Sequence, residues 1–371
     1  MMKKSLFFLF ICATVMLFSC SQKTSESSDE EHLDIPVVEK KIPDLQPGEV
    51  FYKKENPFGE VVSLIGKQEV VDTVIFKTRE SEMIVKNNTI LVKNRGENVF
   101  MSFLLPDFEL LSLSGTYGSG PDEFVSPNLV PTPDSSLIAY VFESSNQKLY
   151  QFDKNGKLST SDFSFTQGRA RFYSDKQVVN VGQNDFMYAE TSDTGKSIFR
   201  TTQVGDSIDV REVFNLALNP KRKSWTNYIG DFAVNPKQNR MVYAYKYFKM
   251  IKFMDLEAET VRTINFEREE FDESTNYKVD GLDQNVTHYW GVCAQDDYVY
   301  FLYSGRTPFD VGKESSRHIH YIYVEQYDWN GNPIACYKLD RWGYFTVDEK
   351  NKKIYLMSTN DDDPFFVYQI P

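Results

Sequence analysis

The stretch "GTYGSGPDEFVSPNLVPTPDSSLIAYVFESSNQKLYQFDKNGKL", residues 115–158, decides the fold. It opens with a glycine-rich loop, and such loops often bind phosphate groups. No parallel-sheet strand precedes this loop and no helical pattern follows it, so the context of a phosphate-binding loop is missing. Two hairpins follow instead, turning at Asp134-Ser135 and at Asn155-Gly156, and Asn-Gly is the strongest short hairpin signal. The loop therefore serves the architecture and connects two sheets.

The same hairpin pattern recurs along the chain. A strand, a short polar turn and a strand rich in tyrosine and aliphatic residues appear six times, at steps of 47, 50, 53, 59 and 54 residues. A second pair of strands follows, for example around the Asn330-Gly331 turn. Six units of four strands predict an all-β fold, a six-bladed β-propeller with four-stranded antiparallel blades. The first-hairpin turns lie at Asn87, Asp134, Asn184, Lys237, Asp296 and Lys350.

The ends of the repeat predict how the ring closes. The sixth unit has three strands and ends with "FFVYQI", whereas "EVVDTVIFKT", Glu69 to Thr78, is a strand without a partner in its own unit. Because an unpaired sheet edge is a liability, we expect this N-terminal strand to complete blade six, with Val70–Thr78 beside Phe365–Ile370. Residues 60–371 then form a single propeller domain.

The quoted stretch resembles the NHL-type repeat and is most similar to the TolB-like six-bladed propeller lipoproteins. The resemblance covers one full blade, and Asp122 stands where the family often has another glycine. The matching residues are Gly118-Ser119-Gly120-Pro121, Glu123-Phe124, Pro127, Phe152-Asp153 and Asn155-Gly156.

The loop has a physical interpretation as a crossover from the outer edge of one blade to the axis of the next. Gly118 and Gly120 permit positive φ angles, and Pro121 makes the bend rigid. We expect Phe124 to wedge between the two blades.

The N-terminus predicts export and lipid attachment. In residues 1–19, Lys3-Lys4 precede thirteen apolar residues, which are too few to span a bilayer and are typical of a signal peptide. The end, "LFSC", resembles the lipobox of Gram-negative bacterial lipoproteins, and this implies cleavage before Cys20 and its acylation; an ordinary signal peptide with a chance cysteine is the alternative. Residues 20–59 then comprise the lipidated cysteine and a flexible tether. We expect an outer-membrane lipoprotein of the cell envelope, held to the membrane by its lipid, on the periplasmic or the surface side.

The net charge of the chain excludes one class of partner. The formal net charge is −12, and it becomes −14 without residues 1–19, which carry only Lys3 and Lys4. No basic footprint is present, so we expect no nucleic-acid partner.

Cys293 and Cys336 fall on the innermost and outermost strands of blade five, roughly 14 Å apart at about 4.8 Å per strand. This distance is too long for a disulfide, so both are predicted to be free thiols.

The long connections predict which face binds a ligand. Loops between blades, and loops between second and third strands, share one face, and they include "LNPKRKSWTNYIGD", "EREEFDESTNYKVDGLDQNVTHYW" and "SGRTPFDVGKESSRHIH". Aromatic and arginine side chains there suit a sugar or a peptide, although the same side chains can simply pack the loops onto the blades. The predicted ligand-binding residues are Glu123, Trp225, Tyr228, Tyr289, Trp290, Arg306 and Arg317.

Two functions remain open. The first is a lipid-anchored binding or scaffold module for a glycan, peptide or protein, with no cofactor, no metal and no assigned catalytic residue. The alternative is a metal-dependent hydrolase working at the axial channel, because some six-bladed relatives are calcium-dependent lactonases. Calcium takes six or more oxygen ligands. The candidate oxygen ligands are Glu82, Glu123, Asn128 and Asp231.

Overall fold

The structure is a computed structural model, and it describes most of the chain beyond residue 47. The described residues are 48–52, 56–78, 81–165, 177–219, 225–266, 278–279, 282–283 and 285–371. The predicted signal peptide at 1–19, Cys20 and much of the predicted tether lie outside these ranges. No helix among the described residues is long and apolar enough to cross a membrane.

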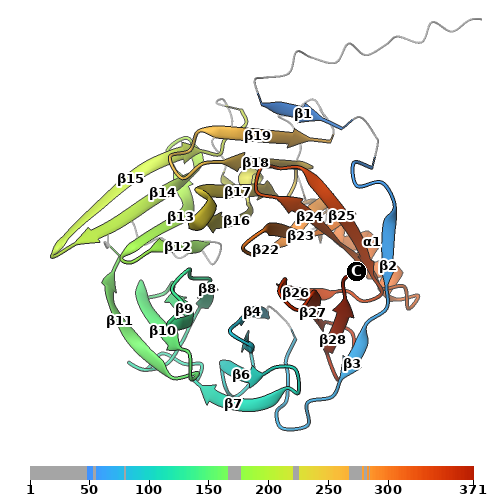
Figure 1. The fold of residues 1–371 in the computed structure, drawn as a ribbon, viewed down its shortest axis with the longest axis horizontal. Helices are drawn as coiled ribbons and strands as arrows, with labels where there is room; N and C mark the ends of the chain where they lie inside the picture. The colour runs from blue at the N-terminus through green and yellow to red at the C-terminus, as the bar shows by residue number, and fades with distance from the viewer. Residues whose placement is uncertain are drawn as a thin grey trace, which may run out of the picture. The chain divides into compact units, whose positions relative to one another are not determined.

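Six sheets surround a central axis and form the predicted six-bladed propeller (Figure 1). In the first three blades the innermost strand comes first in sequence and each strand pairs antiparallel with the next. Blade one comprises β4 (Glu82–Lys86), β5 (Thr89–Lys93), β6 (Phe100–Leu104) and β7 (Glu109–Ser114). Blade two comprises β8 (Pro127–Val130), β9 (Leu137–Glu143), β10 (Lys148–Asp153) and β11 (Leu158–Ser164). Blade three comprises β12 (Val178–Gly182), β13 (Asp185–Ser192), β14 (Gly195–Val204) and β15 (Ser207–Asn215).

The last three blades each gain a strand from the N-terminal segment. Blade four comprises β16 (Gly230–Asn235), β17 (Arg240–Tyr245), β18 (Met250–Met254) and β19 (Thr260–Asn265), with β1 (Glu49–Phe51) parallel to β19. Blade five comprises β22 (Thr287–Ala294), β23 (Tyr298–Arg306), β24 (Ile322–Asp328) and β25 (Pro333–Leu339), with β2 (Val61–Leu64) parallel to β25. Blade six comprises β26 (Gly343–Asp348), β27 (Lys353–Ser358), β28 (Phe365–Gln369) and β3 (Lys67–Glu69).

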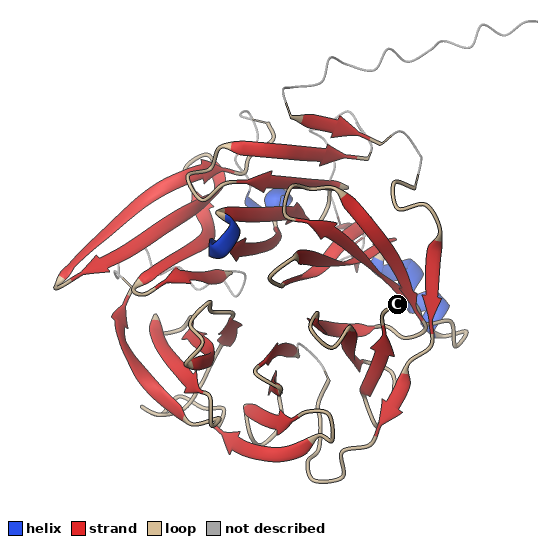
Figure 2. Cartoon of the chain, viewed as in Figure 1, coloured by secondary structure: helices blue, strands red, loops and turns tan. Residues whose placement is uncertain are grey.

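Strands make up nearly all of the regular structure (Figure 2). The other elements sit in connections. They are the 3-10 turns η1 (Trp225–Tyr228) and η2 (Pro236–Gln238), the short pair β20 (Lys278–Val279) and β21 (Leu282–Asp283), and the helix α1 (Pro308–Ser315).

The hydrophobic core lies between the blades. Among the described residues, six clusters of buried apolar side chains occur, one at each seam between neighbouring blades. This follows from the sequence, because second strands such as Thr89–Lys93 are buried along their whole length and present apolar residues to both faces. Each blade is therefore stable only between two neighbours.

The N-terminal strand closes the ring as expected, but at a different place in the sequence. The strand beside β28 is Lys67–Glu69, not Val70–Thr78, and Phe366 faces Gln68 across the pair. The apolar residues of 70–78 have another use, since Val71, Val74 and Phe76 pack onto the seam between blades six and one. Within the stretch predicted as a tether, Glu49–Phe51 also pairs with a blade.

The glycine loop joins blades one and two. As predicted, Phe124 is 2% exposed and wedges between them, with its ring edge-on to Phe100 at 5.1 Å and to Tyr150 at 5.0 Å. The reason for the glycines differs from the expectation, because Gly118 and Gly120 do not have positive φ angles. A Cβ atom on Gly118 would lie 1.9 Å from Oε2 of Glu123, so these glycines make room for the glutamate.

Cys293 on β22 and Cys336 on β25 are free thiols, as predicted from their blade positions. Cys293 accepts a hydrogen bond from the Val347 amide at 3.3 Å, across the seam to blade six. The sheet topology of blade five, with β22 innermost and β25 three strands away, confirms the predicted order of its four strands.

Phe76 offers a test of ring closure. Its ring lies 4.9 Å from Phe365 of blade six and 6.0 Å from Phe103 of blade one, so it covers the closing seam. We expect Phe76→Ala to lower the free energy of unfolding by about 2 kcal/mol, because a partly buried ring is lost. The neighbouring Ile75 is 83% exposed, and Ile75→Ala is the matched control with little expected effect. Equal denaturant midpoints for the two variants would contradict this account of the seam.

Candidate functional site

A cavity of about 600 Å³ lies on the axis of the propeller. Its wall is formed where the six innermost strands begin, so all six blades contribute to it. In this topology the same end carries the connections between blades and the loops between second and third strands. The cavity therefore opens on the long-loop face, where the sequence predicted binding.

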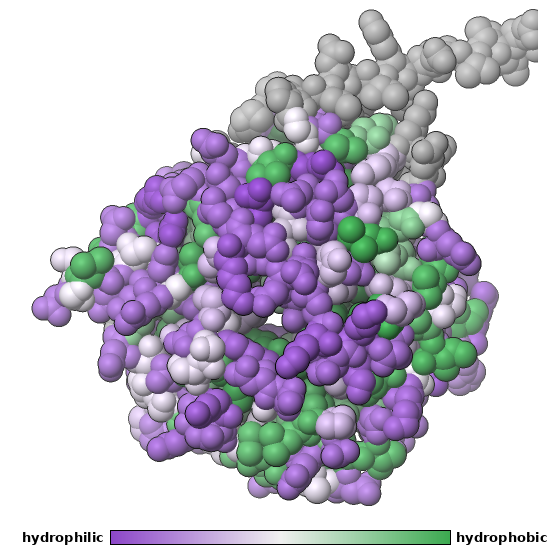
Figure 3. Space-filling model, viewed as in Figure 1, coloured by the Kyte–Doolittle hydropathy of each residue, from purple (hydrophilic) through white to green (hydrophobic). Residues whose placement is uncertain are grey.

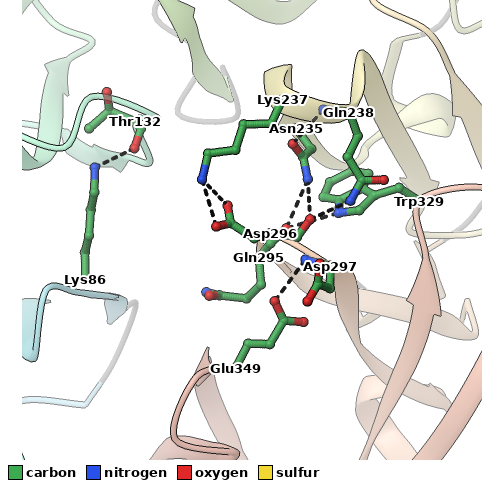
Figure 4. A network of polar contacts seen from close by, with 10 residues as sticks. All are labelled: Lys86, Thr132, Asn235, Lys237, Gln238, Gln295, Asp296, Asp297, Trp329 and Glu349. Atoms are coloured by element: carbon green, nitrogen blue, oxygen red, sulfur yellow. Dashed lines mark hydrogen bonds and ion pairs between the residues drawn. The ribbon is translucent and has the colours of Figure 1, made fainter.

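The opposite end of the axis is occupied by the turns of the first hairpins (Figure 4). Lys237 forms an ion pair with Asp296 at 2.8 Å, and Asn235 donates to the carbonyl of Asp296 at 2.9 Å, which ties blade four to blade five. The Asp297 amide donates to Glu349 at 3.0 Å and extends the ties to blade six. Lys86 of blade one donates to the Thr132 carbonyl of blade two at 2.7 Å. These charged groups are used to hold blades together.

Figure 3 shows hydrophilic residues gathered around a narrow central gap on the face in view. The side chains that line the cavity, which opens on the long-loop face, include both charged signs. The charged lining residues are Glu82, Lys93, Arg95, Asp231 and Lys246.

Two of these charges form an internal pair that also joins blades. The Lys93 ammonium forms an ion pair with Glu82 within blade one and donates to the Pro127 carbonyl of blade two at 3.2 Å. The second Glu82 oxygen accepts the Leu129 amide at 2.6 Å. Glu82 is therefore committed to holding the first inner strand to the second.

Gln177 makes a similar tie between blades three and four. Its carbonyl oxygen accepts the Phe232 amide at 2.6 Å, and its amide nitrogen donates to Asp231 at 3.0 Å. Burial raises the pKa of Asp231 to about 6, against the opposing effects of the Gln177 hydrogen bond and the nearby Lys246 charge. This carboxyl therefore stays protonated to a higher pH than an exposed aspartate does.

Lys246 and Trp290 form the aromatic side of the cavity. The Lys246 ammonium lies 4.8 Å from the centre of the Trp290 ring, and this ring is edge-on to Trp342 at 5.6 Å. The indole nitrogen of Trp290 and the hydroxyl of Ser81, which both belong to lining residues, are buried and have no hydrogen-bond partner in the described part of the chain. Such unsatisfied donors are rare in protein interiors, and these two belong to residues of the cavity wall.

The structure brings two of the predicted ligand-binding residues, Tyr289 and Trp290, to the cavity. Tyr289 is fully buried in the wall and its hydroxyl donates to Glu325 at 3.3 Å. Tyr228 lies elsewhere, fully buried in the seam between blades three and four. Glu123 folds back onto its own loop, where it accepts the Gly120 amide at 2.7 Å.

The remaining predicted residues belong to the long loops. Arg306 forms an ion pair with Glu314 and donates to the Tyr321 carbonyl at 2.6 Å, which fixes α1 against blade five. Arg317 is exposed just after α1. The backbone of Trp225 begins η1, and its side chain lies outside the described part of the structure.

Three of the four candidate calcium ligands, Glu82, Asn128 and Asp231, do line one cavity, whereas Glu123 does not. Glu82 is paired with Lys93, and three cationic side chains share the same cavity. Among the described residues, no three His, Cys, Asp or Glu side chains form a metal-binding group. The charge pattern is therefore the reverse of what a calcium site requires.

Sequence reasoning missed Ser81, Gln177 and Lys246. Each stands one or two places outside a strand of the inner hairpin, just before β4 and β12 or just after β17. The repeat carries a signal for them, because Ser81 and Gln177 occupy the equivalent position before the first strand of a blade and Lys246 directly follows a second strand, but all three lie outside the long loops.

A closed ring of six four-stranded sheets around a polar axial cavity defines this protein as a six-bladed β-propeller. The chain matches the TolB-like 6-blade propeller-like family over residues 60–350, and it belongs to that family. No curated protein matches the sequence.

Two solved structures share the fold. A member of the DUF4221 family from Bacteroides vulgatus is 13% identical, with 83% of this chain and 95% of that chain covered and a TM-score of 0.51. A protein from Bacteroides fragilis that is named as exported is 11% identical, with coverage of 86% and 98% and a TM-score of 0.52. These similarities concern the architecture alone.

The buried carboxyl of Glu325, behind the cavity wall, is expected to make the stability of the protein depend on pH. Burial raises its pKa to about 7, although Lys249 and hydrogen bonds from Tyr327 and Tyr289 oppose the shift. The folded protein therefore holds this proton more tightly than the unfolded chain does, and the resulting stability is lost as pH rises from about 4.5 to 7.

We expect Glu325→Gln to remove this loss, which is on the order of 2 kcal/mol. The free energy of unfolding of the variant should therefore rise relative to that of the wild type as pH rises. The check is urea unfolding of both proteins at pH 5, 6, 7 and 8. Glu259→Gln, at an exposed position, is the control. A constant difference between Glu325→Gln and wild type across this range would contradict the assignment.

Proposed function

We propose that this protein is a binding module of the cell envelope whose ligand, a glycan or a peptide, enters the axial cavity from the long-loop face. The single observation that carries the proposal is the cavity itself, which has a volume of about 600 Å³ and is walled by all six blades. Cavities of roughly 300–1,000 Å³ are usual for small-molecule sites. The unsatisfied donors of Ser81 and Trp290 support the same conclusion.

The envelope location is supported by the signal-like residues 1–19 and the "LFSC" motif. The Bacteroides fragilis protein of the same fold is named as exported, which agrees with this location. In this proposal Cys20 is acylated, and the lipid holds the propeller at the outer membrane.

The cavity is tested by blocking its mouth. Val125 lines the cavity and is 54% exposed, so a larger side chain there fills the entrance without disturbing the core. The probes are neutral disaccharides, uronic-acid disaccharides and tripeptides, measured by isothermal titration calorimetry. We expect at least one probe to bind the wild type and to lose affinity at least tenfold in Val125→Trp.

The matched control is Val204→Trp, at an 80% exposed position where β14 ends, away from the cavity. It should bind the probes as the wild type does. Binding that is equal in the wild type and both variants, or no binding by any probe, would contradict a ligand site on the axis.

The anchor is tested at Cys20. In the native host, Cys20→Ala should abolish labelling by radioactive palmitate and release the protein from the membrane fraction, because the acylated sulfur is lost. Cys293→Ala is the control, since that thiol is part of the seam between blades five and six and should not affect labelling. Palmitate labelling that persists in Cys20→Ala would rule out this anchor.

A further inference from the structure

Lys246 differs from the other lysines at the two ends of the axis. Lys93 is paired with Glu82, Lys237 with Asp296, and Lys86 is held by backbone carbonyls. Among the described residues, the half-buried Lys246 ammonium contacts only the rings of Trp290 and Tyr247, at 4.8 and 5.4 Å, and no ion pair joins it to Asp231. The Lys246 charge acts on the nearby Asp231 without a direct ion pair, so the partly desolvated ammonium still lacks a directly bound anion.

The cavity wall also contains two hydrogen-bond donors that lack an acceptor among the described residues. The Trp290 indole nitrogen can only donate, and it is buried with no acceptor among the residues that the structure describes. Across the axis, Ser81 of blade one is 1% exposed and lines the cavity, and its hydroxyl has no partner within the same ranges. Both groups border the cavity, so an acceptor on a ligand that packs against this wall would complete them.

The charged side chains that line the cavity favour an anionic ligand over a cationic one. Lys93 and Glu82 line the cavity and neutralise each other, and the other charged lining residues are Arg95, Lys246 and Asp231. A cationic ligand would meet more positive than negative charge. An anionic ligand would meet an ammonium that has no competing ion pair within the described part of the chain.

The backbone argues against phosphate as the anion. Phosphate is usually held by several amide groups of a glycine-rich turn or by arginine forks. The glycine-rich loop of this protein uses its amides internally, since Gly120 donates to Glu123 at 2.7 Å and Gly118 to the Phe124 carbonyl at 3.0 Å. An ammonium beside an indole N–H suits the two oxygens of a carboxylate, and Arg95, which also lines the cavity, belongs to a residue type that binds carboxylates.

We propose that the axial cavity binds the carboxylate of a small organic acid, with Lys246 as its counter-ion beside Trp290. This inference rests on the proposed function and specifies the ligand class for the same cavity. The acid can be a sugar acid or a peptide with a free carboxylate, because both present the same group.

The experiment compares each acid with its uncharged derivative. The sugar pair is digalacturonic acid and its dimethyl ester, and the peptide pair is acetyl-alanyl-alanine and its amide. Binding to the intact mature protein is measured by isothermal titration calorimetry. We expect the acid of at least one pair to bind wild type at least tenfold more tightly than its derivative, and the pair that responds identifies the source.

Lys246→Met keeps the apolar stem over Trp290 and removes the charge. It should bind the acid at least tenfold more weakly, with the derivative and the melting temperature unaffected. Lys237→Met removes the same charge from the opposite end of the axis and should bind as the wild type does.

The inference is overturned if acids and derivatives bind equally, if no acid binds, or if Lys246→Met and Lys237→Met behave alike. If any disaccharide or tripeptide still binds in a manner blocked by Val125→Trp, the proposed function stands and only the carboxylate assignment fails. If Val125→Trp blocks nothing, the axial site itself fails.

Discussion

The pairing of Lys67–Glu69 with Phe365–Val367 is the interaction on which the rest of the structure depends. Every blade buries apolar residues on both faces, so a missing seam would expose two hydrophobic surfaces at once. The closing strand comes from the start of the described chain and its three partners from the end. Closure therefore joins the two ends of the propeller, and the aromatic side chains of Phe76, Phe103 and Phe365 seal the seam.

The two ends of the axis have different physical roles. On the hairpin-turn side, short turns place charged and amide side chains close together, and hydrogen bonds between neighbouring blades consume them (Figure 4). On the long-loop side, the inner strands begin at the wall of a cavity, and some donors there have no partner among the described residues. The interlocked hairpin-turn end thus positions the strands whose other ends form the cavity wall.

Local signals explain how much could be predicted from the sequence. Hairpin turns such as Asn155-Gly156 depend on adjacent residues, so the blades and their strand order were predictable, including the separation of Cys293 from Cys336. The closing strand was misplaced because "KQE" has no apolar pattern, whereas residues 70–78 are rich in valine and cover a seam instead. The long loop around Tyr228 predicts a ligand-binding residue, but the ring is buried in a seam that exists only in the assembled propeller. The surroundings of Lys246 likewise depend on how the blades assemble.

An acidic protein with a net charge of −12 is at first an unlikely receptor for an acid. Screening resolves the conflict, because at physiological salt exposed charges separated by more than about 8 Å interact weakly. A ligand inside the cavity would interact mainly with the side chains that face it, because the medium there is less polarisable than water and charges act more strongly. Under the carboxylate proposal, the overall negative charge would slow the approach of an anion and the cavity would supply the local attraction. Since Ser81 and Lys246 lie on opposite blades, a ligand that reaches both also links the two halves of the ring and stabilises its closed form.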